Sequence, residues 1–219
     1  MEWAPLLLSL QVAVAATLIC AVAGVGLGTL LARRFPGRDI VDVLVTAPMV
    51  MPPTVLGYYV LVAIGRRSAI GMAFEALTGS SIVFTKTGAV VAATVGALPL
   101  VVKSARAALE GVDPTLVQAA RTLGASPTRA FFTVHLPLAA GGIVAGLMLA
   151  FARSLGDFGV TLMVAGDIPG ETQTAALAIY DAIQASRDAE AAGMIATLTA
   201  VAVVTLYGVN KLTGSRHEL

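Results

Sequence analysis

The chain has 219 residues, of which 57% are hydrophobic and only 12% are charged, and its formal net charge is +1. Soluble globular domains carry about 25% charged residues. The composition therefore argues against a soluble domain and indicates apolar side chains that face lipid. The nearly neutral charge offers no strong field for nucleic acid, so no nucleic-acid partner is expected.

Five apolar runs are long enough to cross a bilayer as helices, which needs about 20 residues for a core of roughly 30 Å. They are Leu6–Ala32, Ile40–Ile64, Thr87–Ala108, Leu138–Ala165 and Ala192–Asn210. The first run follows a single charged residue, Glu2, and is too long for a signal peptide, so we expect a retained span. The sequence thus predicts one all-α, polytopic membrane domain over residues 1–219, with five transmembrane helices.

The basic residues predict the orientation of these spans, because cytoplasmic loops carry the excess of lysine and arginine. Nine lie on one side: Arg33, Arg34, Arg38, Lys103, Arg106, Arg121, Arg129, Lys211 and Arg216. Only four lie on the other: Arg66, Arg67, Lys86 and Arg187. The first side is predicted to be cytoplasmic, with the N-terminus outside, the C-terminus inside and the loop 109–137 in the cytoplasm. Lys103 and Arg106, at the end of the third run, are expected to snorkel to the membrane surface.

Small residues within the first and fourth runs predict close helix packing. Gly24 and Gly28 form one pair at a spacing of four, and Gly142 and Gly146 form another. The single cysteine, Cys20, lies in an apolar run, where packing is its expected role. The two histidines have no neighbouring cysteine or histidine at metal-ligand spacing, so no metal site is predicted.

Three prolines interrupt the second run: Pro48, Pro52 and Pro53. Because proline lacks a backbone donor, the helix is predicted to kink or break near its middle. A break in lipid needs protein or water to satisfy the freed carbonyls. Two interpretations stay open. One is a gate or hinge with Pro52 and Pro53 on a translocation path, and the other is a static kink.

Start and stop signals predict two short helices in the cytoplasmic loop. Asp113 is a good N-cap, Pro114 suits the first helical position and Gly124 suits the position after the helix. Ser126 and Pro127 repeat the start signal. On the first helix, one face carries Leu116, Ala120 and Leu123 by their i, i+4, i+7 spacing. From caps and periodicity alone, an ordinary connector that packs on its own bundle remains the alternative.

The spacing within residues 118–137, QAARTLGASPTRAFFTVHLP, resembles the EAA loop of bacterial ABC-importer permeases. The family pattern is Glu-Ala-Ala, three residues, Gly, nine residues and Ile-x-Leu-Pro. Here Gln118 replaces the glutamate and Val134 the isoleucine, which puts any ion pair at Gln118 in doubt. The resemblance implies a coupling helix that docks into a separate ATPase subunit through Gln118, Ala119, Ala120, Leu123 and Gly124. The chain has no Walker A motif, so ATP hydrolysis is expected in that partner.

A narrower resemblance points to one branch of these importers. Residues 151–183, FARSLGDFGVTLMVAGDIPGETQTAALAIYDAI, and residues 47–61, APMVMPPTVLGYYVL, resemble the molybdate permeases. This implies the type I ABC importer permease fold in a bacterial cytoplasmic membrane, a non-enzymatic transport subunit without a cofactor, and substrate delivery from outside. The implied partners are a second copy of the chain, a cytoplasmic ATPase dimer and an extracytoplasmic oxyanion-binding protein. Sulfate/thiosulfate and tungstate permeases stay open as alternatives.

Arg153 and Asp157 lie near the middle of the predicted fourth span, four residues apart. A charge at the bilayer centre costs about 2.5–3.5 kcal/mol on insertion scales, so both should face protein or water. In one interpretation they form a self-neutralising pair that fixes helix packing. In the other they line the translocation path, with Arg153 attracting a passing dianion and Asp157 preventing tight retention.

Beyond the fourth span, Thr172 is a plausible N-cap after the Pro169-Gly170 turn. The following apolar stretch, Ala175–Ile183, is too short to cross a membrane and predicts a re-entrant or interfacial helix at the outer face. A helix N-terminus with hydroxyl groups is suited to an oxyanion or a binding protein, with Thr172, Gln173 and Thr174 as candidate contacts. An ordinary packing role in an outer loop remains the alternative.

Two other functional classes compete with an ABC permease. An ion-coupled secondary transporter would use a membrane carboxylate such as Asp157, but it would also predict an internal repeat, and none is evident. A membrane scaffold without transport activity would need neither the charged pair nor the broken second helix. Neither class accounts for the EAA-type loop.

Overall fold

A computed structural model describes residues 3–214, so Glu2 and Arg216 lie outside the described part of the chain. Every regular element in that part is helical, without strands. In chain order the helices are α1 (Ala4–Leu31), α2 (Arg38–Thr46), the 3₁₀ turn η1 (Ala47–Met49), α3 (Pro53–Ile64), α4 (Ala69–Thr78), α5 (Lys86–Glu110), α6 (Pro114–Thr122), α7 (Pro127–Ala130), the π-helical segment η2 (Phe131–His135), α8 (Leu136–Leu155), α9 (Gly159–Ala165), α10 (Ala175–Gln184) and α11 (Asp188–Gly214).

Four stretches of helix are long and apolar enough to cross a membrane. They are Ala4–Leu31, Lys86–Glu110, Pro127–Leu155 and Asp188–Lys211. A fifth crossing is made if the pair Arg38–Met49 and Pro53–Ile64, bent by 115°, is counted as one span. The predicted all-helical membrane fold is thereby confirmed, with one of its five spans broken.

The break in the second span follows from its prolines. Pro48 lies in η1, Pro52 precedes α3 and Pro53 occupies the first position of α3. Since Pro52 and Pro53 supply no N–H groups, the helical ladder cannot continue through them, and the chain restarts in a new direction. The prediction of a kink or break at this point is confirmed.

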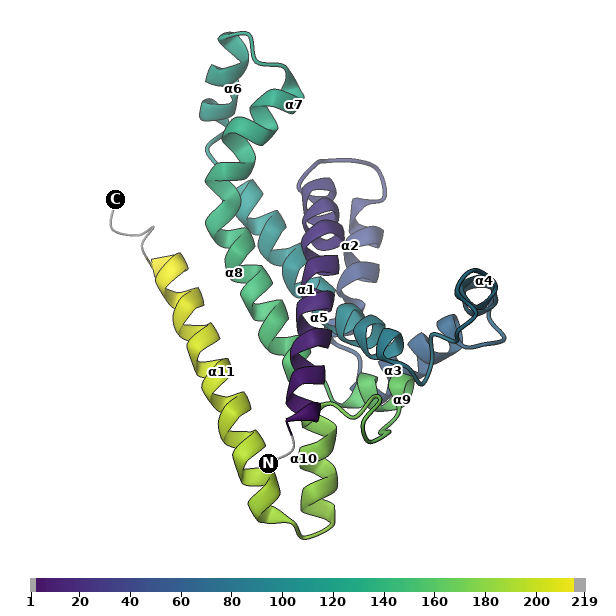
Figure 1. Cartoon of the computed structure of the whole chain (residues 1–219). Coiled ribbons are helices and arrows are strands. Elements are labelled where there is room, and N and C mark those ends of the chain that lie inside the picture. The colour runs from purple at the N-terminus through teal and green to yellow at the C-terminus, as the bar shows by residue number, and fades with distance from the viewer. Residues whose placement is uncertain (1–2, 215–219) are drawn as a thin grey trace.

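At the centre of the bundle, α5 packs against both α1 and α8 (Figure 1). Glycines allow this close approach. A Cβ atom built at Gly24 would lie 2.8 Å from Val101 Cγ1, and one at Gly28 would lie 2.8 Å from Ala105 Cβ. On the other side of α5, a Cβ at Gly142 would lie 2.7 Å from Ala108 Cβ. The predicted packing role of these small residues is confirmed.

The fourth span differs from its predicted limits of 138 and 165 at both ends. The helix begins earlier, because α7, η2 and α8 form one stretch over Pro127–Leu155. The wide π turn directly precedes Pro137, whose ring would clash with the preceding turn of an ordinary α-helix. The helix also ends earlier, at Leu155, and α9 restarts at Gly159. A polar break, rather than a continuous helix, therefore contains Asp157.

Different short helices lie at the two ends of the molecule. In Figure 1, α6 and α7 stand at one end, and α10 lies at the other, beside the start of α1. The short helix α10 packs against α1 and α11. Its length of 10 residues bears out the prediction of an apolar segment too short to cross.

We predict that Gly28→Ala loosens the contact between α1 and α5. Its new methyl group would meet backbone atoms, Val102 O at 3.0 Å and Arg106 N at 3.1 Å, which cannot rotate away. Overpacking of this kind costs about 1–3 kcal/mol. The expected result is a lower thermal unfolding midpoint for the purified chain in detergent. Gly26→Ala is the matched control, because nothing lies within 4 Å of a Cβ there. Equal midpoints for the two variants would contradict this packing account.

Candidate functional site

The loop between α5 and α8 is ordered by local caps. Asp113 Oδ1 accepts a hydrogen bond from Thr115 N at 2.8 Å, and Pro114 opens α6. This backbone hydrogen bond lowers the pKa of Asp113, so the charged cap persists into acidic solution. Gly124 follows the helix with φ of +90°, a left-handed conformation that favours glycine. The predicted start and stop of this helix are confirmed.

Two leucines are exposed on α6 and at its C-terminal end, among polar neighbours that include Gln118 and Arg121. Leu123 is 89% exposed and Leu116 is 49% exposed. Ala119 is exposed and Ala120 half-buried, so the backbone between the two leucines is accessible. Exposed leucines at the projecting end of a molecule are typical of a contact with another protein.

Helix α8 connects this loop mechanically to the interior of the bundle. Ser126 Oγ accepts from Arg129 N at 3.3 Å and caps α7, as predicted. From there the helix runs without a gap through η2 and α8 to Leu155. His135 Nε2 donates to the carbonyl of Leu109 at 3.0 Å, which ties the start of α8 to the end of α5.

A set of ion pairs joins α2 to α5, and the sequence did not predict it. Asp42 accepts from Lys103 at 2.9 Å and from Arg106 at 3.2 Å. Glu110 accepts from Arg106 at 3.0 Å and from Arg38 at 2.7 Å. Lys103 and Arg106 thus have carboxylate partners within the protein, and the expectation that they also snorkel to the membrane surface stays a prediction. The available signal was that Asp42 and Glu110 lie at the same predicted cytoplasmic end of the second and third spans as these basic residues.

Arg153 and Asp157 form a further charged cluster. Arg153 Nη1 donates to Asp157 Oδ1 at 2.9 Å. The second carboxylate oxygen accepts from the backbone N and the hydroxyl of Thr161, at 2.9 and 2.7 Å. Asp157 is 3% exposed, whereas the side chain of Arg153 is 39% exposed. Asp157 thus orders the start of α9 while leaving part of the guanidinium accessible.

The broken second span lies next to this charged cluster. A Cβ built at Gly159 would lie only 2.6 Å from Pro53 Cβ. A Cβ at Gly96 of α5 would lie 3.6 Å from Arg153 Nη2 and 3.7 Å from Asp157 Oδ1. The structure therefore gathers three of the four predicted path residues in one region, and Pro52 lies exposed beside Pro53.

The predicted outer contacts are corrected by their burial. Thr172, Gln173 and Thr174 are 1%, 8% and 4% exposed, so they offer almost no surface to a partner protein. Thr172 Oγ1 instead accepts from Ile168 N at 3.1 Å and stabilises the preceding turn.

The predicted N-cap of α10 is also corrected. Thr174, not Thr172, occupies this position, and it makes no side-chain cap bond. Ser9 Oγ of α1 accepts from Ala175 N at 2.8 Å in its place. This long-range cap could not be found from local spacing.

Comparison with known families identifies the class of this bundle. Residues 24–211 match the family described as binding-protein-dependent transport system inner membrane component. The chain belongs to this family. The match confirms a multi-pass inner membrane protein and a transport subunit rather than an enzyme, and it implies ATPase and binding-protein partners. It also agrees with the expectation that the permease carries no cofactor and that ATP is bound by the ATPase subunit.

Individual relatives cover almost the whole permease. The chain is 45% identical over 207 residues to the molybdenum transport system permease protein ModB of Escherichia coli strain K12, covering 94% of this chain and 90% of the relative. It is 46% identical over 185 residues to the protein of the same name from Haemophilus influenzae, covering 84% and 81%. In fold it is similar to a chain of the inward-facing methionine ABC transporter MetNI, with a TM-score of 0.70, 18% identity and coverage of 96% and 94%.

We predict that Asp157→Ala destabilises the permease by about 1–3 kcal/mol, because Arg153 and two donors of Thr161 lose a buried charged acceptor. Asp157→Asn keeps an oxygen for Thr161 and should lose less. Thermal unfolding of the purified chain measures both, with Asp39→Ala on exposed α2 as the control. A midpoint for Asp157→Ala equal to that of the control would show that the cluster does not hold the break together.

Proposed function

We propose that the chain is the permease subunit of an ATP-driven molybdate importer. The observation that carries this proposal is the 45% identity, over nearly the whole chain, to a permease named for molybdenum transport. The motif series in residues 151–183 supports the same substrate. Tungstate is chemically so close to molybdate that it stays a second substrate, and sulfate or thiosulfate is the alternative oxyanion.

The irregular second span supports a homodimer with the translocation path between the two copies. Val50, within the break, is 86% exposed in the single protomer. Irregular backbone at membrane depth is tolerated only when it is covered by protein or lines water. A second copy and a water-filled path would provide both, and Pro52, Pro53, Arg153 and Asp157 then lie at the path.

The exposed Leu116 and Leu123 support docking to the ATPase through Gln118, Ala119, Ala120, Leu123 and Gly124. The two alanines keep the helix narrow, and the two exposed leucines supply the apolar contact. Closure of the ATPase dimer would push α6, and the continuous helix Pro127–Leu155 would carry this movement to Arg153. An ion-coupled secondary transporter would give these features of α6 no role.

The distribution of basic residues supports an outside N-terminus and a cytoplasmic C-terminus. This orientation puts α6 in the cytoplasm with the ATPase and α10 at the outer face with the binding protein. The arrangement of these two helices at opposite ends of the molecule fits the assignment (Figure 1). In this proposal residues 1–219 form one permease domain.

We predict that Gly124→Arg abolishes co-purification of the ATPase while membrane insertion is preserved, because the arginine occupies the docking surface. Gly79→Arg is a matched control. It also follows a helix at positive φ, of +70°, with nothing within 4 Å, but it lies away from the docking loop. Both substitutions place an arginine at positive φ, which costs a similar backbone strain of roughly 1–2 kcal/mol. Retention of the ATPase by Gly124→Arg would refute the coupling role.

We predict that the variant Arg153→Gln lowers the maximal rate of molybdate uptake by about 10-fold, equivalent to about 1.4 kcal/mol in the barrier. Loss of the positive charge removes the attraction for a dianion in the path. The double variant Arg153→Gln with Asp157→Asn separates the two roles of the pair. If the pair is purely structural, removal of both charges should restore uptake along with thermal stability. If Arg153 acts on the translocation path, uptake should stay low in the double variant. Surface-exposed Arg187→Gln is the control.

A further inference from the structure

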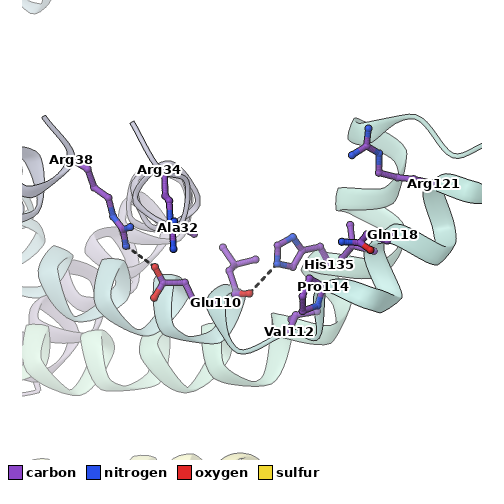
Figure 2. Close-up of a pocket in the computed structure, with 11 residues that line it drawn as sticks. Ala32, Arg34, Arg38, Glu110, Val112, Pro114, Gln118, Arg121 and His135 are labelled. Atoms are coloured by element: carbon purple, nitrogen blue, oxygen red, sulfur yellow. Dashed lines mark hydrogen bonds and ion pairs between the residues drawn. The ribbon is translucent and has the colours of Figure 1, made fainter. Parts of the chain in front are cut away.

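A pocket of about 630 Å³ lies where α1 and α5 end and α6 begins. Figure 2 shows Arg34 and Arg38 on one side of it and Arg121 and His135 on the other. Glu110 lies on the side of Arg38, to which it is hydrogen-bonded. The coupling helix therefore forms one wall of this pocket, and the ends of two membrane spans form the rest.

The pocket carries more positive charge than its own carboxylate neutralises. Three arginines line it against one glutamate. Glu110 is already shared between Arg38, at 2.7 Å, and Arg106, at 3.0 Å. Among residues 3–214, Arg34 and Arg121 take part in no ion pair, and both are exposed. These two guanidinium groups are available to an anion from outside the protomer.

Further donors lie on the same walls. Gln118 lines the pocket, and its amide is both a donor and an acceptor. The Nε atom of Arg38 is buried without a partner in the part of the chain that the structure describes. Arginine forks match the paired oxygens of a phosphate group, which makes phosphate the anion that this arrangement suits best.

The deeper wall is apolar, which favours a lipid over a free ion. Ala32, Leu109, Val112 and Val117 line it. A neighbouring pocket of about 200 Å³ shares Arg121 and His135 and continues along α1 past Thr29, beside Phe131. A site with a basic rim and an apolar floor, placed where spans leave the membrane, matches a phosphate headgroup with the start of its acyl chains.

We propose that this pocket binds the phosphate headgroup of an anionic phospholipid from the cytoplasmic leaflet. The inference rests on the proposed function only in placing α6 on the cytoplasmic side. Because Arg121 and Gln118 belong to α6 while Arg34 follows α1, a lipid bound here joins the coupling helix to the membrane spans. It would thereby hold α6 in the position from which it receives the ATPase.

The test uses the purified full-length chain in neutral detergent, with added phosphatidylglycerol or phosphatidylcholine, and native mass spectrometry to count bound lipids. The double variant Arg34→Gln with Arg121→Gln removes the two unpaired charges. The control is Arg66→Gln with Arg67→Gln, an exposed basic pair in a loop away from the pocket. Each arginine near an anionic headgroup contributes about fivefold in affinity, so the double variant should bind phosphatidylglycerol ~25-fold more weakly.

The proposal requires wild type and control to prefer phosphatidylglycerol over phosphatidylcholine and the pocket variant to lose that preference. Equal binding of phosphatidylglycerol by the wild type and the pocket variant would overturn it. Displacement of the lipid by millimolar inorganic phosphate would assign the pocket to a free anion, and displacement by the ATPase would assign it to that protein. Either result also overturns the lipid assignment. Lipid binding is measured without transport, so failed molybdate uptake and failed lipid binding are separate results.

Discussion

A bilayer core offers no hydrogen-bond partners, and this constraint governs where the chain departs from a straight helix. Among residues 3–214, two breaks interrupt the predicted spans. One is the turn between Met49 and Pro53, and the other is the gap between Leu155 and Gly159. They lie against each other, because Gly159 packs on Pro53. Asp157 supplies an acceptor for the backbone at the start of α9, whereas the break in the second span stays exposed at Val50 in the single protomer.

The helices of the bundle also differ in how closely they pack. Contacts at Gly24, Gly28 and Gly142 bring backbones too close for independent sliding of α1, α5 and α8. In contrast, α2 is held to α5 by ion pairs of Arg38 and Asp42, and none of residues 38–55 is buried. Under the proposed coupling role, a movement of α6 would have a stiff route through α8 and would act on a less tightly packed second span.

Sequence reasoning predicted those features that depend on local chemistry. The caps at Asp113 and Ser126, the left-handed glycine at Gly124 and the proline break were all predicted correctly, because each depends on residues within a few positions. Features that depend on distant residues were missed. The carboxylate partners of Lys103 and Arg106, the cap that Ser9 gives to α10 and the burial of Thr172 all arise from tertiary packing. For Lys103 and Arg106 only the membrane surface was considered, whereas in the fold both form ion pairs with carboxylates of the protein.

Uptake of labelled molybdate at limiting concentration tests the central claim most directly. Cells lacking this chain and every other molybdate route would be compared with cells in which the chain is restored, with unlabelled tungstate and sulfate as competitors. The account predicts that restoration rescues uptake, that tungstate blocks it and that sulfate does not. Failure of the restored chain to raise uptake, in cells that also make the ATPase and the binding protein, would contradict the molybdate assignment, and a block by sulfate would transfer it to a sulfate permease.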